Sequence, residues 1–433
     1  MIKNLMLLLI TIFFIIGVGE WLFPKFIGKL PLRLYGLIDK DLRILAQSSK
    51  NNLLPKGYIA LTGDSYAVGA GDWLNEVKKN NFFGSPDYSP AHLIFKKTGI
   101  DVVSFGQSGA GSFDGIWSEP ITQFLYINST RNYRLPPPKY FLIFFYEGND
   151  VYDNIQFVNE NLRATAKEIG KAYEINRFQD FLKAEFEKVV NRKFDRSFWK
   201  VMLFTRSIYQ GISNLFKEWE ASKKTSKEKN FYHQSIYKGG VAVILMDGRK
   251  VELNVALMNG KKTGLPSHLQ APPLFGHTDS EKKIGLRSES LAGAIEVFKQ
   301  SLHNLNKLFP QSEIKIVFIP STLSSYKIIS SNVHYRGFVQ SPNIIETATI
   351  EKSHARLCGA IKQAAVDHNF SFVNITKSIR LASSVEFVHG PLDWDHFNKR
   401  GYQVLSDHLA KLFLQQEKKI RVDDCIVGGG WIE

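Results

Sequence analysis

Cysteine is scarce in this sequence: only two of the 433 residues, Cys358 and Cys425, carry a thiol. Neither residue lies in a CxxC or similar metal-ligand spacing, so the sequence offers no cysteine-based metal site. The two residues are far apart in the chain, and two states stay open for them. They form one disulfide in an oxidising compartment, or both remain unpaired.

Internal repeats, long low-complexity tracts and a long basic tail are absent as well. The chain has 55 Lys and Arg residues against 41 Asp and Glu residues, and this net charge of +14 is spread along its length. Such a charge favours anionic neighbours, for example an acidic glycan or phospholipid headgroups. No zinc-ligand spacing and no RNA-binding aromatic signature accompanies it, so we do not expect a nucleic-acid partner. Because 44% of the residues are hydrophobic, the chain has enough apolar material for a core.

One long apolar run stands at the N-terminus, uncharged from Leu5 to Gly19 and extended by the apolar residues 21–23. About 15 residues is the length of a signal-peptide core and is short of the about 20 that span a bilayer. We therefore expect residues 1–23 to be a signal peptide or a membrane anchor, and a buried core helix is the alternative. Lys25 and Lys29 follow the run, which counts mildly against export. We still expect the remaining chain to be secreted, or anchored and facing the periplasm or exterior.

Apolar runs alternate with helical patterns along much of the chain. The patterns predict helices over residues 89–99, 288–310 and 344–369. The apolar runs predict strands at 58–62, 101–105, 140–146, 313–320 and 370–376. Strands that alternate with helices are typical of an α/β chain with a parallel sheet and helices on both faces.

The segment 154–283 interrupts this alternation. It contains two amphipathic helical stretches and two β-prone runs that flank Asp247-Gly248, a dipeptide typical of hairpin turns. We interpret it as an insertion, either a cap over the site or a surface for an envelope protein partner. The predicted organisation is an N-terminal segment (1–23), a linker (24–55), an α/β domain in two parts (56–153 and 284–415), the insertion (154–283) and a C-terminal tail (416–433).

Polar clusters follow the predicted strands at four places, residues 63–65, 107–109, 147–150 and 391–396. In a parallel α/β sheet, reactive groups collect at the carboxyl ends of the strands. Each cluster alone has an ordinary explanation as a turn, a flexible loop or a helix cap. Four of them in order, each at the end of a predicted strand or downstream of the last one, favour a catalytic site.

The residue types of these clusters suit nucleophilic catalysis. Ser65 is the candidate nucleophile, His396 the base that takes its proton, and Asp393 the group that orients the imidazole. Asp395 competes for that last role. The oxyanion needs preformed donors, for which we expect the Ser65 N–H, the Gly109 N–H and the Asn149 side-chain amide.

Several further side chains are candidates for contact with a substrate. We expect Tyr66, Glu147, Trp394 and His389 to line the site. Aromatic residues near the clusters stack on sugar rings or belong to the core; they are Tyr66, Trp73, Trp117, Tyr146 and Trp394.

The ordered set of GDS, a glycine turn, GND and DxxH resembles the SGNH (GDSL-type) hydrolase superfamily. In that family's four blocks the matching residues are Ser65, Gly109, Asn149 and His396, and the resemblance covers about residues 56–155 and 313–413. It implies a three-layer, flavodoxin-like fold with five parallel strands, ester substrates, no metal and no organic cofactor. Two positions depart from the family pattern: Tyr66 replaces the usual Leu, and Glu147 stands where Gly is common.

The leading functional hypothesis is an exported or membrane-anchored serine esterase that removes O-acyl groups, most readily O-acetyl, from an envelope or extracellular glycan. An O-acyltransferase that modifies a cell-envelope polysaccharide is the alternative, because water or a sugar hydroxyl attacks the same acyl-enzyme. A non-catalytic glycan-binding or scaffold protein is a third hypothesis. The four residue types of the site argue against it.

Overall fold

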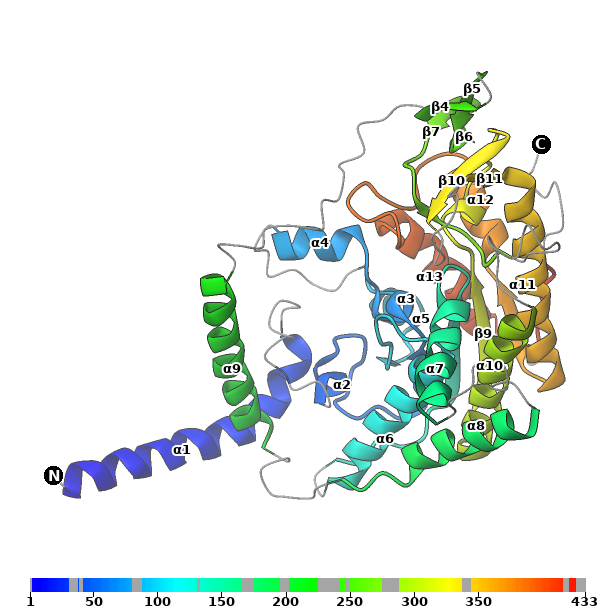
Figure 1. Cartoon of the computed structure of the whole chain (residues 1–433). Coiled ribbons are helices and arrows are strands. Elements are labelled where there is room, and N and C mark those ends of the chain that lie inside the picture. The colour runs from blue at the N-terminus through cyan, green and yellow to red at the C-terminus, as the bar shows by residue number, and fades with distance from the viewer. Residues whose placement is uncertain are drawn as a thin grey trace.

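The structure is a computed structural model, and it describes most of the chain (Figure 1). The described residues are 2–30, 38, 42–79, 88–130, 133–165, 175–194, 202–224, 242–246, 249–274, 288–336, 344–415 and 420–425.

A five-stranded parallel sheet forms the centre of the fold. Its strands are β1 (Ile59–Thr62), β2 (Val102–Ser104), β3 (Tyr140–Tyr146), β9 (Glu313–Ile319) and β12 (Ser371–Asn374). Their order is β12-β9-β3-β1-β2, and every neighbouring pair is parallel. The prediction of an α/β chain with five parallel strands is confirmed. The strands form where the sequence has near-continuous apolar runs, which a sheet buried on both faces requires.

Helices cover both faces of the sheet, and β3 shows why two separate apolar layers result. Phe141, Ile143 and Phe145 enter one layer, whereas Leu142 and Phe144 enter the other, because successive side chains of a strand point to opposite faces. The first layer includes residues of η4 (Phe113–Ser118), α6 (Glu119–Ser129), α7 (Asp150–Thr165), α8 (Ile175–Val190), α10 (Ser288–Leu308) and α11 (Thr347–Asp367). The second includes residues of α3 (Ser65–Val68), α4 (Asp72–Lys79), α5 (Pro90–Thr98), η8 (Leu323–Ser325), α12 (Thr376–Ser383) and α13 (Lys399–Leu414).

The three helices predicted from the sequence are all present, as α5, α10 and α11. α5 illustrates how local signals set the bounds. It begins at Pro90, whose missing N–H costs nothing in the first turn, and it ends before Gly99, which adopts a positive φ of 70°.

The insertion is joined closely to the α/β domain. Its boundary at residue 154 lies inside the continuous helix α7, so no break in the fold occurs there. The predicted hairpin is present as β4 (Ala242–Met246) and β5 (Arg249–Leu253), although its two turn residues lie outside the described residues. The remaining elements of the insertion are α9 (Leu203–Lys224), β6 (Val255–Met258), β7 (Lys261–Gly264) and β8 (Leu269–Gln270).

Strands from the second part of the α/β domain complete a sheet with the insertion. β10 (Asn332–Arg336) pairs with β11 (Ile344–Glu346), with β5 and with β8. Figure 1 shows this smaller sheet above one end of the central sheet.

The N-terminal segment is a single apolar helix, α1 (Ile2–Phe26), followed by η1 (Ile27–Lys29) and α2 (Arg43–Ala46). From Lys3 to Lys29 it is long and apolar enough to cross a membrane, a test that a signal sequence also passes, and its apolar window is not buried in the protein. Figure 1 shows α1 projecting away from the rest of the molecule. It is therefore not the buried core helix that was the alternative.

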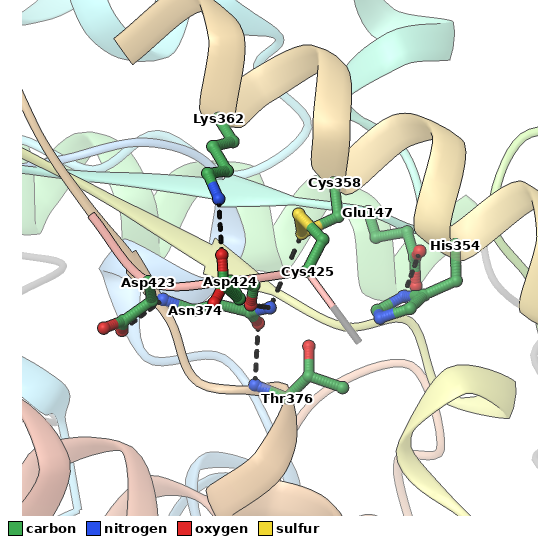
Figure 2. The surroundings of a disulfide bond; sticks show 9 residues. All are labelled: Glu147, His354, Cys358, Lys362, Asn374, Thr376, Asp423, Asp424 and Cys425. Carbon is green, nitrogen blue, oxygen red and sulfur yellow. Dashed lines mark hydrogen bonds and ion pairs between the residues drawn. A yellow bond between two sulfur atoms is a disulfide. The ribbon is translucent and has the colours of Figure 1, made fainter. Parts of the chain in front are cut away.

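The C-terminal segment 420–425 lies along the outer edge of β12. The Phe372 N–H donates to Arg421 O at 2.7 Å, and the Asp423 N–H donates to Phe372 O at 3.0 Å, as in a parallel ladder. A disulfide joins Cys425 to Cys358 on α11, which resolves the two states that the sequence left open (Figure 2). This part of the predicted tail thus belongs to the fold.

Candidate active site

The turn after β1 places Ser65 at the start of a short helix. Gly63 has a φ of 134°, and a Cβ there would lie 2.7 Å from the carbonyl oxygen of Phe144, so a side chain does not fit. Asp64 caps the helix by accepting a hydrogen bond from the Tyr66 N–H at 2.9 Å. Ser65 is then the first residue of α3, where its own N–H has no acceptor within the helix.

Ser65, His396 and Asp393 form a continuous hydrogen-bond relay. Ser65 Oγ lies 2.8 Å from His396 Nε2, and His396 Nδ1 lies 2.8 Å from Asp393 Oδ2. The Ser65 residue is 8% exposed, whereas the side chains of His396 and Asp393 are 22% and 15% exposed. The relay is therefore sheltered but open to solvent, which is the arrangement that nucleophile, base and orienting carboxylate need.

Asp393 and His396 each stabilise the charged form of the other. Burial alone would lower the pKa of His396, but the hydrogen bond and the negative charge of Asp393 outweigh burial and raise it. Burial would likewise raise the pKa of Asp393, yet the His396 ring and two backbone N–H groups hold it below its ordinary value. Asp393 is thus ionised and His396 is a stronger base than a free imidazole.

Asp395, the competing carboxylate, does not contact the imidazole. Its Oδ2 pairs with Arg336 Nη1 at 2.9 Å, and its N–H donates to Asp393 Oδ1 at 3.0 Å. The geometry therefore assigns the orienting position to Asp393.

The loop 391–396, which we call the relay loop, is held in place by hydrogen bonds to Tyr66 of α3 and Asp72 of α4. The Leu392 N–H donates to Asp72 Oδ2 at 3.2 Å, and the Asp393 N–H donates to Asp72 Oδ1. The Tyr66 hydroxyl donates to Asp395 O at 2.9 Å. Burial raises the pKa of Asp72 to about 6. Sequence reasoning missed Asp72 and this contact of Tyr66, because both partners are more than 300 positions away in the chain.

The loops after β2 and β3 adjoin the Ser65 turn, since β1 lies between β2 and β3 in the sheet. The Gln107 N–H donates to Gly63 O at 3.0 Å. Gly106 packs directly on α3, where a Cβ would lie 2.7 Å from the Val68 nitrogen. Gly109, two residues further, is exposed and has a φ of 71°. The predicted oxyanion residues are thus brought to one edge of the sheet.

Asn149 follows β3 and lies beside a group of buried carboxyls. Its Nδ2 donates to Asp153 Oδ2 at 2.9 Å, which leaves the second amide hydrogen for another acceptor. Burial and repulsion from Asp64 and Asp114 raise the pKa of Asp153 to about 7. Burial, with the charges of Asp64 and Asp153, also raises the pKa of Asp150 well above its ordinary value. Part of this group therefore stays protonated near neutral pH, which limits the negative charge next to Ser65.

Three of the four expected substrate-lining side chains are buried and contact protein instead. Glu147 is 0% exposed, pairs with His354 Nδ1 at 2.6 Å and accepts a hydrogen bond from the Ser321 N–H. These buried contacts hold the loop after β3 in place. His389 is also 0% exposed, and its Nδ1 lies 3.3 Å from the Tyr326 hydroxyl. Tyr66 is 0% exposed, with its hydroxyl committed to the relay loop. The prediction for these three was wrong. A polar residue at the end of a strand can be buried and hold a loop in place, instead of being exposed to a substrate.

Trp394 alone of the four is partly exposed, and it packs edge-on against Phe387 with ring centroids 5.4 Å apart. The other aromatic residues near the clusters, Tyr66, Trp73, Trp117 and Tyr146, are at most 3% exposed and belong to the core. Their side chains are therefore not available to stack on a sugar ring.

The end of the insertion contacts residues that hold the relay loop in place. Tyr146 stacks on Tyr66 with ring centroids 4.2 Å apart, and its hydroxyl donates to Gln270 Oε1 of β8. Arg336, which pairs with Asp395, is on the neighbouring strand β10. The insertion and the second sheet thus border the relay loop.

Comparison with known proteins found no matching family model, no matching curated protein and no matching solved structure. Within the ranges given above, no group of three His, Cys, Asp or Glu side chains is arranged to hold a metal ion.

Proposed function

We propose that the protein is a serine hydrolase of the SGNH (GDSL) type that cleaves O-acyl esters through an acyl-enzyme. The observation that carries this proposal is the relay of two 2.8 Å hydrogen bonds from Ser65 through His396 to Asp393. The strand order β2-β1-β3-β9-β12, which is 2-1-3-4-5 within the central sheet, supports it as well, since that order is typical of flavodoxin-like folds.

In the first half of the proposed reaction, His396 Nε2 accepts the Ser65 Oγ proton while Oγ attacks the ester carbonyl. The negative charge moves to the carbonyl oxygen, where the Ser65 N–H, the Gly109 N–H and the free amide hydrogen of Asn149 are proposed to stabilise it. The His396 imidazolium then gives its proton to the leaving alcohol, and the C–O bond breaks. The ionised Asp393 stabilises that imidazolium.

In the second half, His396 removes a proton from water, and the hydroxide attacks the Ser65 acyl ester. The same oxyanion donors act again, and Ser65 is released with its proton returned from His396. An O-acyltransferase would differ only in the nucleophile of this step, a sugar hydroxyl in place of water. We propose hydrolysis, because the side chains of His396 and Asp393 are 22% and 15% exposed, which is enough for water to reach the relay.

The proposed substrate is an O-acetylated envelope or extracellular glycan, and the proposed location is outside the cytoplasm, anchored by α1. The disulfide between Cys358 and Cys425 supports this location, since disulfides persist in oxidising compartments. The apolar length of α1 also supports it. The net charge of +14 favours an acidic polymer as the substrate.

The test compares the wild type with Ser65→Ala and with a control, Ser331→Ala, which changes an exposed serine before β10. We expect Ser65→Ala to lose hydrolysis of p-nitrophenyl acetate by about 10³-fold or more and to lose labelling by a fluorophosphonate. Ser331→Ala should keep both. Equal turnover by Ser65→Ala and wild type would refute the proposal.

The same assay separates hydrolase from transferase. With acetylated polysaccharide as donor and a second glycan as acceptor, hydrolysis predicts free acetate as the main product. Acylated acceptor in excess of free acetate would establish the transferase instead.

A further inference from the structure

The helix α9 is attached to the end of the apolar helix α1 by specific contacts. Glu20 caps α9: its Oε1 accepts from the Thr205 N–H and the Thr205 hydroxyl, each at 2.8 Å, and its Oε2 accepts from the Phe204 N–H. The Phe204 ring also packs edge-on against Phe23 at 5.8 Å and lies on Gly19, where a Cβ would displace the ring. The start of α9 is therefore fixed relative to α1 (Figure 1).

These contacts lie at the level where a membrane surface would cross α1. Trp21 is 66% exposed, and the Lys25 ammonium lies 3.8 Å from the centre of its ring. Tryptophan and lysine at the end of an apolar helix are typical of the headgroup region. Glu20 precedes Trp21, so α9 starts at the same depth.

One face of α9 is apolar and exposed among the described residues. Ile208, Ile212 and Phe216 recur every four residues and are 45%, 49% and 63% exposed, and Tyr209 beside them is 70% exposed. Residues four apart lie on one face of a helix, so these side chains form a continuous stripe. We call these four residues the α9 stripe.

The opposite side of α9 is bound to the protein. Leu203 and Ser207 are buried, and Arg206 donates to the Tyr126 hydroxyl on α6. The first turns of α9 are thus bound to the rest of the protein on the side opposite to the α9 stripe. Lys217, next to Phe216, is exposed and adds positive charge beside the stripe.

We propose that α9 is an interfacial membrane helix whose stripe inserts into the surface of the bilayer that α1 spans. An exposed apolar face with basic residues beside it is the pattern of helices that lie in the headgroup region. The bilayer is the occupant because α1 brings it to the point where Glu20 holds α9. Since the other side of α9 is bound to α6, this second contact fixes the orientation of the body on the membrane. The inference rests on the proposed membrane span of α1 and is independent of the proposed hydrolysis.

The test uses the full chain in vesicles of phosphatidylethanolamine and phosphatidylglycerol, with the photocrosslinker p-benzoylphenylalanine introduced at single positions. Ile212 and Phe216 probe the α9 stripe. Gln210, which is part-buried and lies three residues after Ser207 on the opposite side of the same helix, is the matched control. Phe13, which is 73% exposed in the middle of α1, reports whether α1 is embedded. After irradiation, mass spectrometry identifies lipid and protein adducts.

We expect lipid adducts at Phe13, and about tenfold more lipid adduct at Ile212 and Phe216 than at Gln210. Adducts at Phe13 without excess adducts at Ile212 and Phe216 would overturn the inference and leave the α1 span intact. Crosslinked dimers at Ile212 or Phe216 would overturn it in favour of contact with a second copy. Absence of lipid adducts at Phe13 would overturn both the span and the interfacial helix, while esterase activity with a soluble ester would still test the proposed reaction.

Discussion

The substitution Tyr66→Phe tests what the Tyr66 hydroxyl does. It either holds the relay loop in place or contacts the substrate, as its position beside Ser65 would suggest. The substitution removes one hydroxyl, whose hydrogen bond to Asp395 O is 2.9 Å long. Loss of such a bond lowers the free energy of unfolding by about 0.5–1.5 kcal/mol. The Tyr146 hydroxyl lies 3.4 Å from the same oxygen, but its single hydrogen is donated to Gln270 Oε1, so it does not replace the lost bond. We therefore expect a fold that is intact and slightly less stable.

The effect on catalysis follows from the loop that Asp395 shares with the relay. Less restraint on this loop allows His396 to leave its place 2.8 Å from Ser65 Oγ. We expect kcat for p-nitrophenyl acetate to fall about tenfold, which corresponds to about 1.4 kcal/mol in the activation barrier. Because Tyr66 is 0% exposed, KM and the preference for acetyl over butyryl esters should stay unchanged.

The control for this prediction is Tyr58→Phe. Its hydroxyl is buried and has no hydrogen-bond partner among the described residues, so its removal should leave both stability and kcat unchanged. Urea denaturation and steady-state kinetics on three proteins complete the experiment. A Tyr66→Phe enzyme with unchanged kcat and an altered acetyl-to-butyryl preference would refute the supporting role.

Two further predictions concern the disulfide and the pH dependence of the relay. Replacing Cys358 and Cys425 by Ser removes a link across 67 positions, and the entropy of closing such a loop predicts a loss of about 4 kcal/mol in unfolding free energy. An unchanged urea midpoint would contradict it. The proposed base, His396, would act unprotonated, and its pKa is raised above 6.5, so kcat/KM should rise with pH and reach its plateau above neutrality. In Asp393→Asn the lost charge lowers the pKa of His396, so the same rise should occur at lower pH, with a maximum reduced about 10³- to 10⁴-fold; a rise at unchanged pH would count against this assignment.

The central sheet was predictable from the sequence because its strands are buried on both faces. Such a strand must be apolar at nearly every position, as residues 140–146 are, and a helical or surface segment rarely matches that pattern. The three relay residues were predictable for a related reason. Ser65 follows β1, and Asp393 lies three residues before His396 in the loop that precedes α13, so the four polar clusters taken in order pointed to these residues.

The supporting contacts of the site were not predictable, since each joins residues far apart in the chain. Asp72 was not among the predicted site residues, although it accepts two hydrogen bonds from the relay loop. Glu147 was expected to line the site, and its burial depends on its pairing with His354 of α11. The partner of Asp395 is Arg336, from a strand that no sequence pattern indicated. In each case the side chain's neighbour is set by the packing of the completed fold.

The position of residues 420–425 has a consequence for the order in which the protein is completed. These residues are synthesised after every strand of the central sheet, and they pair with the outer edge of β12. Until they arrive, that edge offers unpaired N–H and C=O groups to any other extended chain. Lys362 on α11 pairs with Asp424 at 2.7 Å and adds a polar contact to the segment next to Cys358 (Figure 2). The disulfide between Cys425 and Cys358 ties this segment to α11, so the part of the chain that covers the sheet edge against other chains is also held by a covalent bond.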